Sequence, residues 1–170
     1  MRTGTARVYV YSADQIADAI ITRAKLDPLL VDRKVRAYRA TTDQAIPATT
    51  FTKVQLNAET FDVGADFDPV TNYRFTVPAG AAGYYLIAAN ISVYGNAAAG
   101  WALAAIFKNG TAVATGTQNY PAAAPIGSVH VEDYLALVAG DYIEIWIYMD
   151  TAGQVALGSV STWADFLRIF

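Results

Sequence analysis

The sequence predicts an all-β protein, built as an antiparallel double-sheet jelly roll behind a short N-terminal arm. Two observations carry this prediction. Long runs with period-two alternation, such as Tyr84–Tyr94 and Tyr142–Met149, are typical of strands whose two faces have different neighbours. Breaks rich in Gly, Pro, Asn and Asp separate the runs, and no helical period follows residue 40. Many short strands without helices favour a jelly roll.

Residues 1–34 are predicted to form the arm. Ala6–Tyr11 alternates as a short strand does, and Ser12–Gln15 fits a capping box that starts a helix. Pro28 ends the helical pattern. The apolar stripe of this helix would pack on its own subunit or dock on a partner, and the partner-docking candidates are Arg7, Val8, Val10, Ile16, Ile20 and Ile21.

Residues 35–170 are predicted to form the jelly-roll head. Asn109-Gly110 between two alternating runs indicates a hairpin, because both residues tolerate the positive φ that a two-residue turn requires. Ala139–Asp141 marks a second tight turn. The expected strands are Val35–Thr41, Thr50–Leu56, Phe61–Phe67, Tyr73–Val77, Tyr84–Tyr94, Trp101–Phe107, Thr111–Thr117, Ser128–Val138, Tyr142–Met149, Gln154–Val160 and Trp163–Phe170.

The two faces of the strand Tyr142–Met149 differ in a way that predicts a protein contact. One face is apolar enough for the sandwich interior, and the other is too aromatic for open water. These faces are Ile143, Ile145, Ile147 and Met149, and Tyr142, Glu144, Trp146 and Tyr148. A sandwich with a further aromatic face favours assembly over catalysis.

Charge is scarce and unevenly distributed. Charged residues make up 16% of the chain, against about 25% in average proteins. Residues 1–40 carry eight basic and four acidic residues, a net charge of +4, whereas residues 41–170 carry four basic and eleven acidic ones, a net charge of −7. So few charges on the body predict a surface covered by further copies. The basic start favours an acidic protein partner or solubility over nucleic acid.

Several chemistries and locations are excluded or disfavoured by composition. The chain has no cysteine, which excludes disulfides, thiolate metal sites and a thiol nucleophile. No apolar run indicates a secretory signal or a spanning helix, so we expect neither secretion by that route nor a membrane partner. No phosphate-cradling glycine loop is present, and no cofactor is expected.

Five short sequence motifs occur in an order that indicates a family resemblance. They are Phe67-Asp-Pro69, Tyr73–Pro78, the G-x-Y element Gly83–Tyr85, the leucine-to-Gly-Asp element Leu135–Ile143 and the closing Phe166-Leu167. In this order they resemble the globular head of complement C1q and its tumour-necrosis-factor-like relatives, over residues 35–170. The chain departs from the pattern where Ala79–Ala82 lengthens the interval before Gly83, and where Ala89 replaces a common aromatic.

The resemblance implies a ten-stranded jelly roll that forms a homotrimer about a threefold axis lined by aromatic side chains. Tyr85 would line the axis, followed by Tyr142 and Phe170. The aromatic face with Trp146 and Tyr148 agrees with such a contact. Each aromatic could instead belong to the core. The family's usual collagen stalk has no counterpart, because the chain contains no Gly-X-Y repeat.

Residues that could do chemistry are few. His130 is the single histidine, and alternation places it beside Ser128 and Glu132 on an exposed or interface face, where it is a weak candidate for a general base. Asp62, Asp66 and Asp68 could hold calcium, although solvated turn carboxylates are the default interpretation. A hydrolase would need two carboxylates facing each other across a cleft.

These features favour a structural role. A head without a secretion signal, cysteine or collagen resembles the small jelly-roll proteins that decorate bacteriophage heads and fibres. This resemblance is in the general kind of protein and not in a sequence motif. We therefore expect a non-enzymatic trimeric capsid decoration or head-fibre protein, held on the major capsid or another virion protein by its arm and assembled in the host cytoplasm. The alternative is a receptor- or glycan-binding module, whose ligand-facing candidates are Tyr94, Trp101 and Tyr120, with Asn96 and Asn119.

Overall fold

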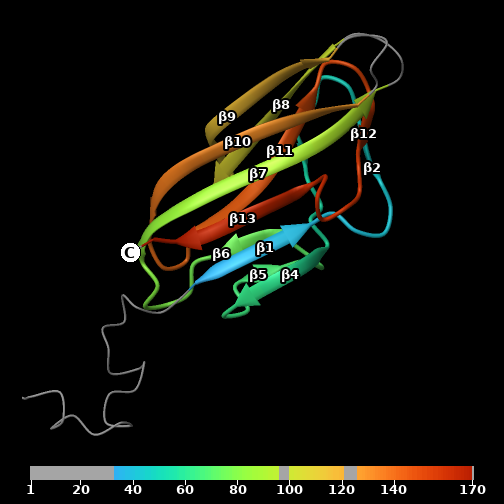
Figure 1. Ribbon diagram of the computed structural model, residues 1–170. Coiled ribbons are helices and arrows are strands. Elements are labelled where there is room, and N and C mark those ends of the chain that lie inside the picture. The colour runs from blue at the N-terminus through green and yellow to red at the C-terminus, as the bar shows by residue number, and fades with distance from the viewer. Residues whose placement is uncertain (1–32, 96–99, 121–125, 170) are drawn as a thin grey trace, which may run out of the picture. The chain divides into compact units, whose positions relative to one another are not determined.

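Two antiparallel sheets lie against each other in the computed structural model of the chain (Figure 1). The structure describes residues 33–95, 100–120 and 126–169. The first sheet has seven strands in these ranges and is here called the β7 sheet. One of its strands, β10 (Ile126–Leu137), pairs there with β7 alone. The remaining order is β2 (Gln44–Ile46), β12 (Gly153–Val155), β7 (Gly83–Gly95), β13 (Trp163–Arg168), β1 (Lys34–Tyr38) and β4 (Ala58–Val63).

The second sheet, here called the β11 sheet, covers the inner face of the first. The short strand β3 (Thr52–Lys53) also pairs with β11. The main order is β5 (Phe67–Asp68), β6 (Arg74–Thr76), β11 (Tyr142–Met149), β8 (Gly100–Lys108) and β9 (Thr111–Tyr120). The all-β double-sheet jelly roll predicted from the sequence is confirmed. The described part of the chain has thirteen strands where ten were expected, and five of them have only two or three residues.

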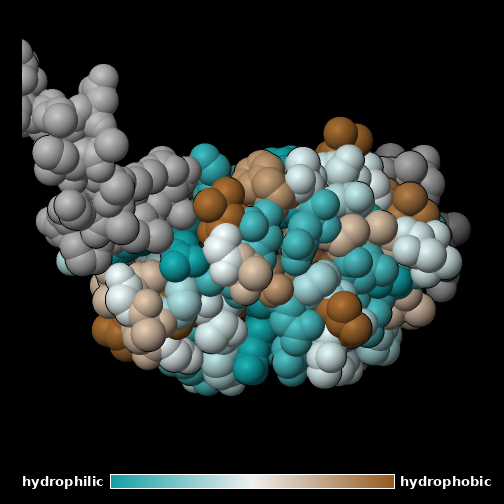
Figure 2. All heavy atoms as spheres, turned by 90° about the horizontal axis from the view of Figure 1, so that it is seen from below, coloured by the Kyte–Doolittle hydropathy of each residue, from teal (hydrophilic) through white to brown (hydrophobic). Residues whose placement is uncertain are grey.

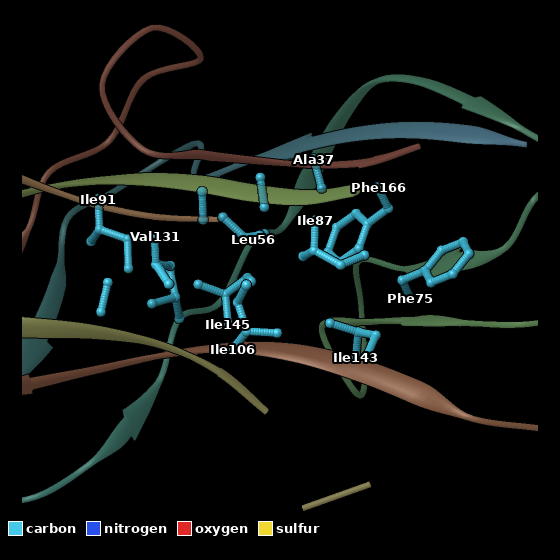
Figure 3. Close-up of a cluster of buried hydrophobic side chains, with 14 of the residues drawn as sticks. Ala37, Leu56, Phe75, Ile87, Ile91, Ile106, Val131, Ile143, Ile145 and Phe166 are labelled. Atoms are coloured by element: carbon cyan, nitrogen blue, oxygen red, sulfur yellow. The ribbon is translucent and has the colours of Figure 1, made fainter. Parts of the chain in front are cut away.

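The core fills the space between the two sheets. Period-two alternation turns every second side chain of β7 and β11 inward. The predicted interior set of β11 is confirmed, because Ile143, Ile145, Ile147 and Met149 are all buried. Figure 3 shows Ile87 and Ile91 on one layer and Ile106, Ile143 and Ile145 on the other, with side chains from both meeting in the middle. Full burial of each such side chain contributes about 1.5–3 kcal/mol.

Turn chemistry sets where the strands end. Asn109 and Gly110 both have positive φ, which confirms the hairpin between β8 and β9. The predicted strand Phe61–Phe67 is instead two strands, because Gly64 and Ala65 adopt positive φ and interrupt the ladder. The predicted strand Gln154–Val160 shortens to β12, and β2 was not predicted. Three residues are too few to carry a clear alternation.

One edge of the sandwich closes by a very close backbone approach. A Cβ atom on Gly116 of β9 would lie 1.9 Å from the carbonyl oxygen of His130 in β10. No side chain fits at that distance. Glycine at this position therefore allows a strand of the β11 sheet to meet a strand of the β7 sheet.

The head begins earlier in the sequence than the predicted arm boundary. Arg33 Nη1 lies 3.2 Å from Asp66 Oδ2, and the Arg168 amide donates to the Arg33 carbonyl at 2.9 Å. Lys34, Arg36 and Arg39 follow in β1 or directly after it. Residues 1–32 then keep four basic and four acidic residues, so their net charge is zero. The excess positive charge assigned to the arm belongs to the head.

The strand and helix predicted within residues 1–34 lie outside the described residues, with the exception of Arg33 and Lys34. This applies to all six partner-docking residues: Arg7, Val8, Val10, Ile16, Ile20 and Ile21. Within the described ranges the chain forms strands and turns, and none of its segments is a helix able to cross a membrane.

Candidate assembly surface on the outer face of the β7 sheet

The outer face of the β7 sheet is a grid of side chains fixed by strand register. Each strand contributes every second residue, and register places these residues in rows across the sheet. The row near one end of the sheet is Tyr134, Leu86, Leu167, Lys34 and Val63. The next row is Glu132, Ala88, Asp165, Arg36 and Phe61, and the third is His130, Asn90, Trp163 and Tyr38.

Large apolar side chains are exposed on this face. Tyr134 is 65% exposed, Tyr84 50%, Phe61 42% and Leu167 40%. They come from four different strands, and charged residues stand among them in the middle row. Figure 2, which views the molecule from below, shows small hydrophobic patches between hydrophilic residues on that side of the molecule. Such a mixed surface is typical of protein contacts that form between already folded partners.

A groove of about 310 Å³ crosses the apolar part of the face. Val35 and Phe166, whose side chains are buried in the core, also border the groove. The other lining residues come from β1, β4, β7 and β13, and they are Lys34, Arg36, Phe61, Leu86, Ala88, Asp165 and Leu167. Open grooves with mostly apolar walls are typical of binding surfaces.

A partly buried ion pair lies in the wall of this groove. Arg36 Nη1 donates to Asp165 Oδ2 at 2.8 Å, and the Arg36 guanidinium carbon lies 4.2 Å from the centre of the Trp163 ring. Burial raises the pKa of Asp165, and the positive charge of Arg36 opposes that rise. Asp165 Oδ1 is buried without a hydrogen-bond partner in the described residues. Charge is therefore already partly desolvated at the centre of the face.

His130 lies on the same face and not in a cleft. Its Nε2 is 3.6 Å from Glu132 Oε2, and both side chains are more than half exposed. The prediction that His130 shares a face with Glu132 is confirmed by their alternation in β10. Its ring also meets the edge of Trp163, with ring centres 6.3 Å apart. This is a surface histidine on a flat sheet.

Tyr85, predicted to line a trimer axis, lies instead in the sandwich interior. Its side chain is fully buried, its ring centre is 5.5 Å from that of Phe75, and its hydroxyl donates to the Ala81 carbonyl at 2.6 Å. A side chain with no exposed area contributes none to a contact with another chain. The neighbouring Tyr84 points outward, so the G-x-Y element presents its middle residue to the surface.

The aromatic residues on the outer face of β11 stack on other aromatic residues of the same chain and remain partly exposed. Ring centres of Trp101 and Tyr148 are 5.0 Å apart, and those of Phe107 and Trp146 are 4.8 Å apart. Phe51 closes the row at 5.4 Å from Tyr148. The aromatic side chains of β11 therefore have packing partners within their own chain. Tyr142, Trp146 and Tyr148 remain partly exposed, so their role in an interface stays a prediction.

Polar neighbours also pack against that face. Lys53 Nζ pairs with Glu144 Oε1 at 2.6 Å, and the Arg74 guanidinium carbon lies 4.3 Å from the centre of the Tyr142 ring. Phe170, the remaining predicted interface residue, lies outside the described residues.

The predicted calcium ligands are engaged in other interactions. Asp62 Oδ2 accepts the Phe67 amide at 2.9 Å, and Asp66 pairs with Arg33. Asp68 accepts three backbone amides of the following turn, which lower its pKa to about 2. No group of three metal-ligating side chains occurs within the described ranges. The three aspartates are turn and ion-pair residues, so the calcium interpretation is not supported.

The predicted ligand-facing residues do not converge. Tyr94 is in β7, where its hydroxyl meets Asp43 and also Gln154 Oε1 at 2.8 Å. The Asp43 hydrogen bond raises the pKa of the Tyr94 phenol. Trp101 stacks on Tyr148 on the outer face of the other sheet. The side chains of Tyr120 and Asn119, and the whole of Asn96, lie outside the described part of the chain.

The surface residues that the sequence reasoning missed all belong to rows across strands. Phe61, Leu86, Tyr134, Asp165 and Leu167 come from strands that are far apart in sequence. The sequence does contain one usable pattern, because alternation along β7 predicts that Tyr84 and Leu86 share one face. Alternation does not tell which of the two faces is inside.

Comparison with known proteins identifies the fold. No family model matches the chain, and no curated protein matches its sequence. Solved structures do match. Murine APRIL at pH 5.0 is similar with a TM-score of 0.63 and 13% identity, covering 81% of this chain and 99% of that one.

Two other matches have the same architecture. The globular domain of zebrafish complement 1qA has a TM-score of 0.59 and 16% identity, and covers 81% of this chain and 98% of its own. The Eiger TNF of S. frugiperda has a TM-score of 0.63 and 10% identity, with 82% and 93% covered. The chain therefore has the C1q/TNF-like jelly-roll fold, as the sequence resemblance implied. At these identities the likeness establishes the fold alone.

Proposed function

We propose that the chain is a non-enzymatic structural or binding head that assembles as a homotrimer through the outer face of its β7 sheet. The observation that carries this proposal is the set of large apolar side chains exposed on four strands around a groove on that face. Copies of the same chain would cover these side chains and reduce the exposed apolar area. The low charge content and the C1q/TNF-like fold support the same proposal.

The test is the mass of the full chain in solution, measured by light scattering on a gel-filtration column. Three copies of the 18.2 kDa chain weigh about 55 kDa, and this is the expected mass. A mass near 18.2 kDa at all concentrations up to the micromolar range would exclude the proposed assembly.

We further propose that the trimer decorates a bacteriophage-like particle, as a capsid decoration or head-fibre protein, with residues 1–34 attached to the major capsid or another virion protein. Three arms on one trimer would bind with avidity at a threefold lattice position. Since residues 1–32 carry no net charge, the attachment would rest on apolar residues such as Ile16, Ile20 and Ile21. Assembly would take place in the host cytoplasm and leave the protein on the particle surface.

The attachment is testable on particles from the natural source. An antibody against the chain should label the virus-like band of a density gradient and decorate particle surfaces in electron micrographs. Labelling confined to the free-protein fractions of the gradient would contradict the decoration role.

A receptor- or glycan-binding role is the second candidate. The observation in its favour is the aromatic row of Trp101, Tyr148 and Phe51, which lies on the sheet opposite the proposed assembly face and would point away from it in a trimer. A glycan array probed with the labelled protein tests this role. Binding that Trp101→Ala removes would support it, and an array without specific binding would count against it.

A further inference from the structure

Two features of the outer face of the β7 sheet fit each other. One is Tyr134, the most exposed aromatic side chain of the described residues, on β10 at one flank. The other is the groove, which begins at Leu86 one strand away and extends to Phe61 at the opposite flank. Tyr134 is 65% exposed, so it does not fill the groove of its own chain.

We propose that the groove receives the Tyr134 side chain of a second copy of this chain. This inference rests on the proposed trimer and names the contact that holds it. A volume of about 310 Å³ leaves room for one aromatic side chain. Its apolar wall of Leu86, Ala88 and Leu167 suits a phenol ring.

The charges around the two features are complementary. Glu132 precedes Tyr134 by two residues on the same outward face, and its carboxylate is 65% exposed. Lys34, Arg36 and Asp165 line the groove, and because Arg36 is paired with Asp165, Lys34 leaves the lining with a net charge of +1. When Tyr134 of one copy enters the groove of the next, Glu132 of the first copy approaches Lys34 of the second. Opposite charges in register suppress wrong pairings and fix the orientation.

The placement of the two features also fits a ring. The aromatic side chain and the groove are different parts of one face, so a copy that inserts its Tyr134 keeps its own groove open for a third copy. Contacts of this heterologous kind close into a ring when the rotation between copies allows it. Each copy in a trimer then gives one tyrosine and receives one.

The first experiment compares Tyr134→Ala and Tyr134→Phe with the unmodified chain by light scattering at several concentrations. Tyr134→Ala is expected to shift the mass from about 55 kDa toward 18.2 kDa, because the ring that fills the groove is lost. Tyr134→Phe keeps the ring and is expected to stay trimeric. Thermal unfolding followed by circular dichroism should confirm that both variants are folded, since Tyr134 is exposed.

The second experiment tests the register by exchanging charges. Glu132→Lys should lower the share of trimer at low ionic strength, because it faces Lys34 with a like charge. Combining it with Lys34→Glu should restore the trimer. Failure of the double variant to recover, together with dissociation by Lys34→Glu alone, would overturn the proposed pairing.

The outcomes separate this inference from the proposed function. If the unmodified chain is a monomer, the trimer itself is excluded. If the unmodified chain is a trimer and Tyr134→Ala remains one, the trimer stands and the groove contact is overturned. Dissociation of Tyr134→Phe to the same extent as Tyr134→Ala would overturn the role assigned to the ring.

Discussion

At the scale of single residues, one position along a strand separates the core from the surface. Tyr84 and Tyr85 are neighbours of the same type, yet Tyr84 is half exposed and Tyr85 is fully buried. Burial obliges Tyr85 to satisfy its hydroxyl inside the protein, which it does at the Ala81 carbonyl. Residue type alone therefore does not assign an aromatic side chain to an interface.

The buried hydroxyl of Tyr85 makes a measurable contribution. Tyr85→Phe removes the donor to the Ala81 carbonyl, so we expect the free energy of unfolding in urea to fall by about 1 kcal/mol. Tyr134→Phe removes an exposed hydroxyl and serves as the control with no expected change in chain stability. Equal stability of the Tyr85→Phe variant and the unmodified chain would show that this hydrogen bond contributes nothing net.

At the scale of strands, two close contacts between elements hold the sandwich together. Gly116 lets β9 approach the backbone of His130 in β10. At the turn before β11, Asp141 Oδ2 accepts the Val138 amide at 2.9 Å, and Oδ1 accepts Asn109 Nδ2 at 2.7 Å. The second contact joins the β10–β11 turn to the β8–β9 hairpin.

Gly116→Ala tests the closed edge. The added methyl group would overlap the His130 carbonyl, so β9 and β10 must separate, at a cost of roughly 1–3 kcal/mol. Chemical denaturation measures this cost. Val113→Ala, on the same strand but exposed, is the matched control, with an expected change within about 0.5 kcal/mol. A Gly116→Ala variant as stable as its control would show that the edge can open freely.

Asp141 gives the fold an acid-sensitive turn. Hydrogen bonds from the Val138 amide and Asn109, with the Lys108 charge, lower its pKa to about 2, against about 3.9 in an unfolded chain. A lowered pKa in the folded state contributes stability above the unfolded value, and that stability is lost as pH falls from about 4 to 2. In Asp141→Asn we expect a shallower loss of unfolding free energy over this range. The variant still loses some unfolding free energy in this range, because Asp68 also has a pKa of about 2 and is unchanged.

At the scale of the whole molecule, the two outer faces of the sandwich differ in how they are covered. On the β11 sheet the aromatic residues pack against Phe51, Phe107, Lys53 and Arg74 of the same chain, and Phe51 is the large aromatic side chain left exposed there, at 40%. The β7 sheet leaves Phe61, Tyr84, Tyr134 and Leu167 exposed around a groove. Self-assembly through the second face is consistent with this asymmetry.

Two truncations test where the head starts. A chain that begins at Asp32 keeps the Arg33–Asp66 ion pair and all of β1, so we expect it to fold with nearly the melting temperature of the full chain. A chain that begins at Val35 loses that pair and the first residue of β1, and should melt several degrees lower. Equal melting of the two shortened chains would place the boundary after Lys34, as the sequence alone suggests.

The strand pattern and the fold were accessible from the sequence for a local reason. Alternation in Tyr142–Met149 and the Asn109-Gly110 turn depend on residues next to each other, and the structure confirms both. The breaks at Gly64 and Gly158 and the short β2 were missed, because positive φ at a single residue leaves no mark on the alternation and three residues are too few to show one.

The sequence by itself determined an all-β jelly roll, its main strands and its low charge, because spacing and composition act within short stretches of chain. The tertiary structure alone decided which face of each strand is inside, and which residues become neighbours. Leu86, Asp165, Arg36 and Phe61 meet in one groove only because β7, β13, β1 and β4 pair in register. Register depends on the packing of both sheets together, and no single segment of the chain encodes it.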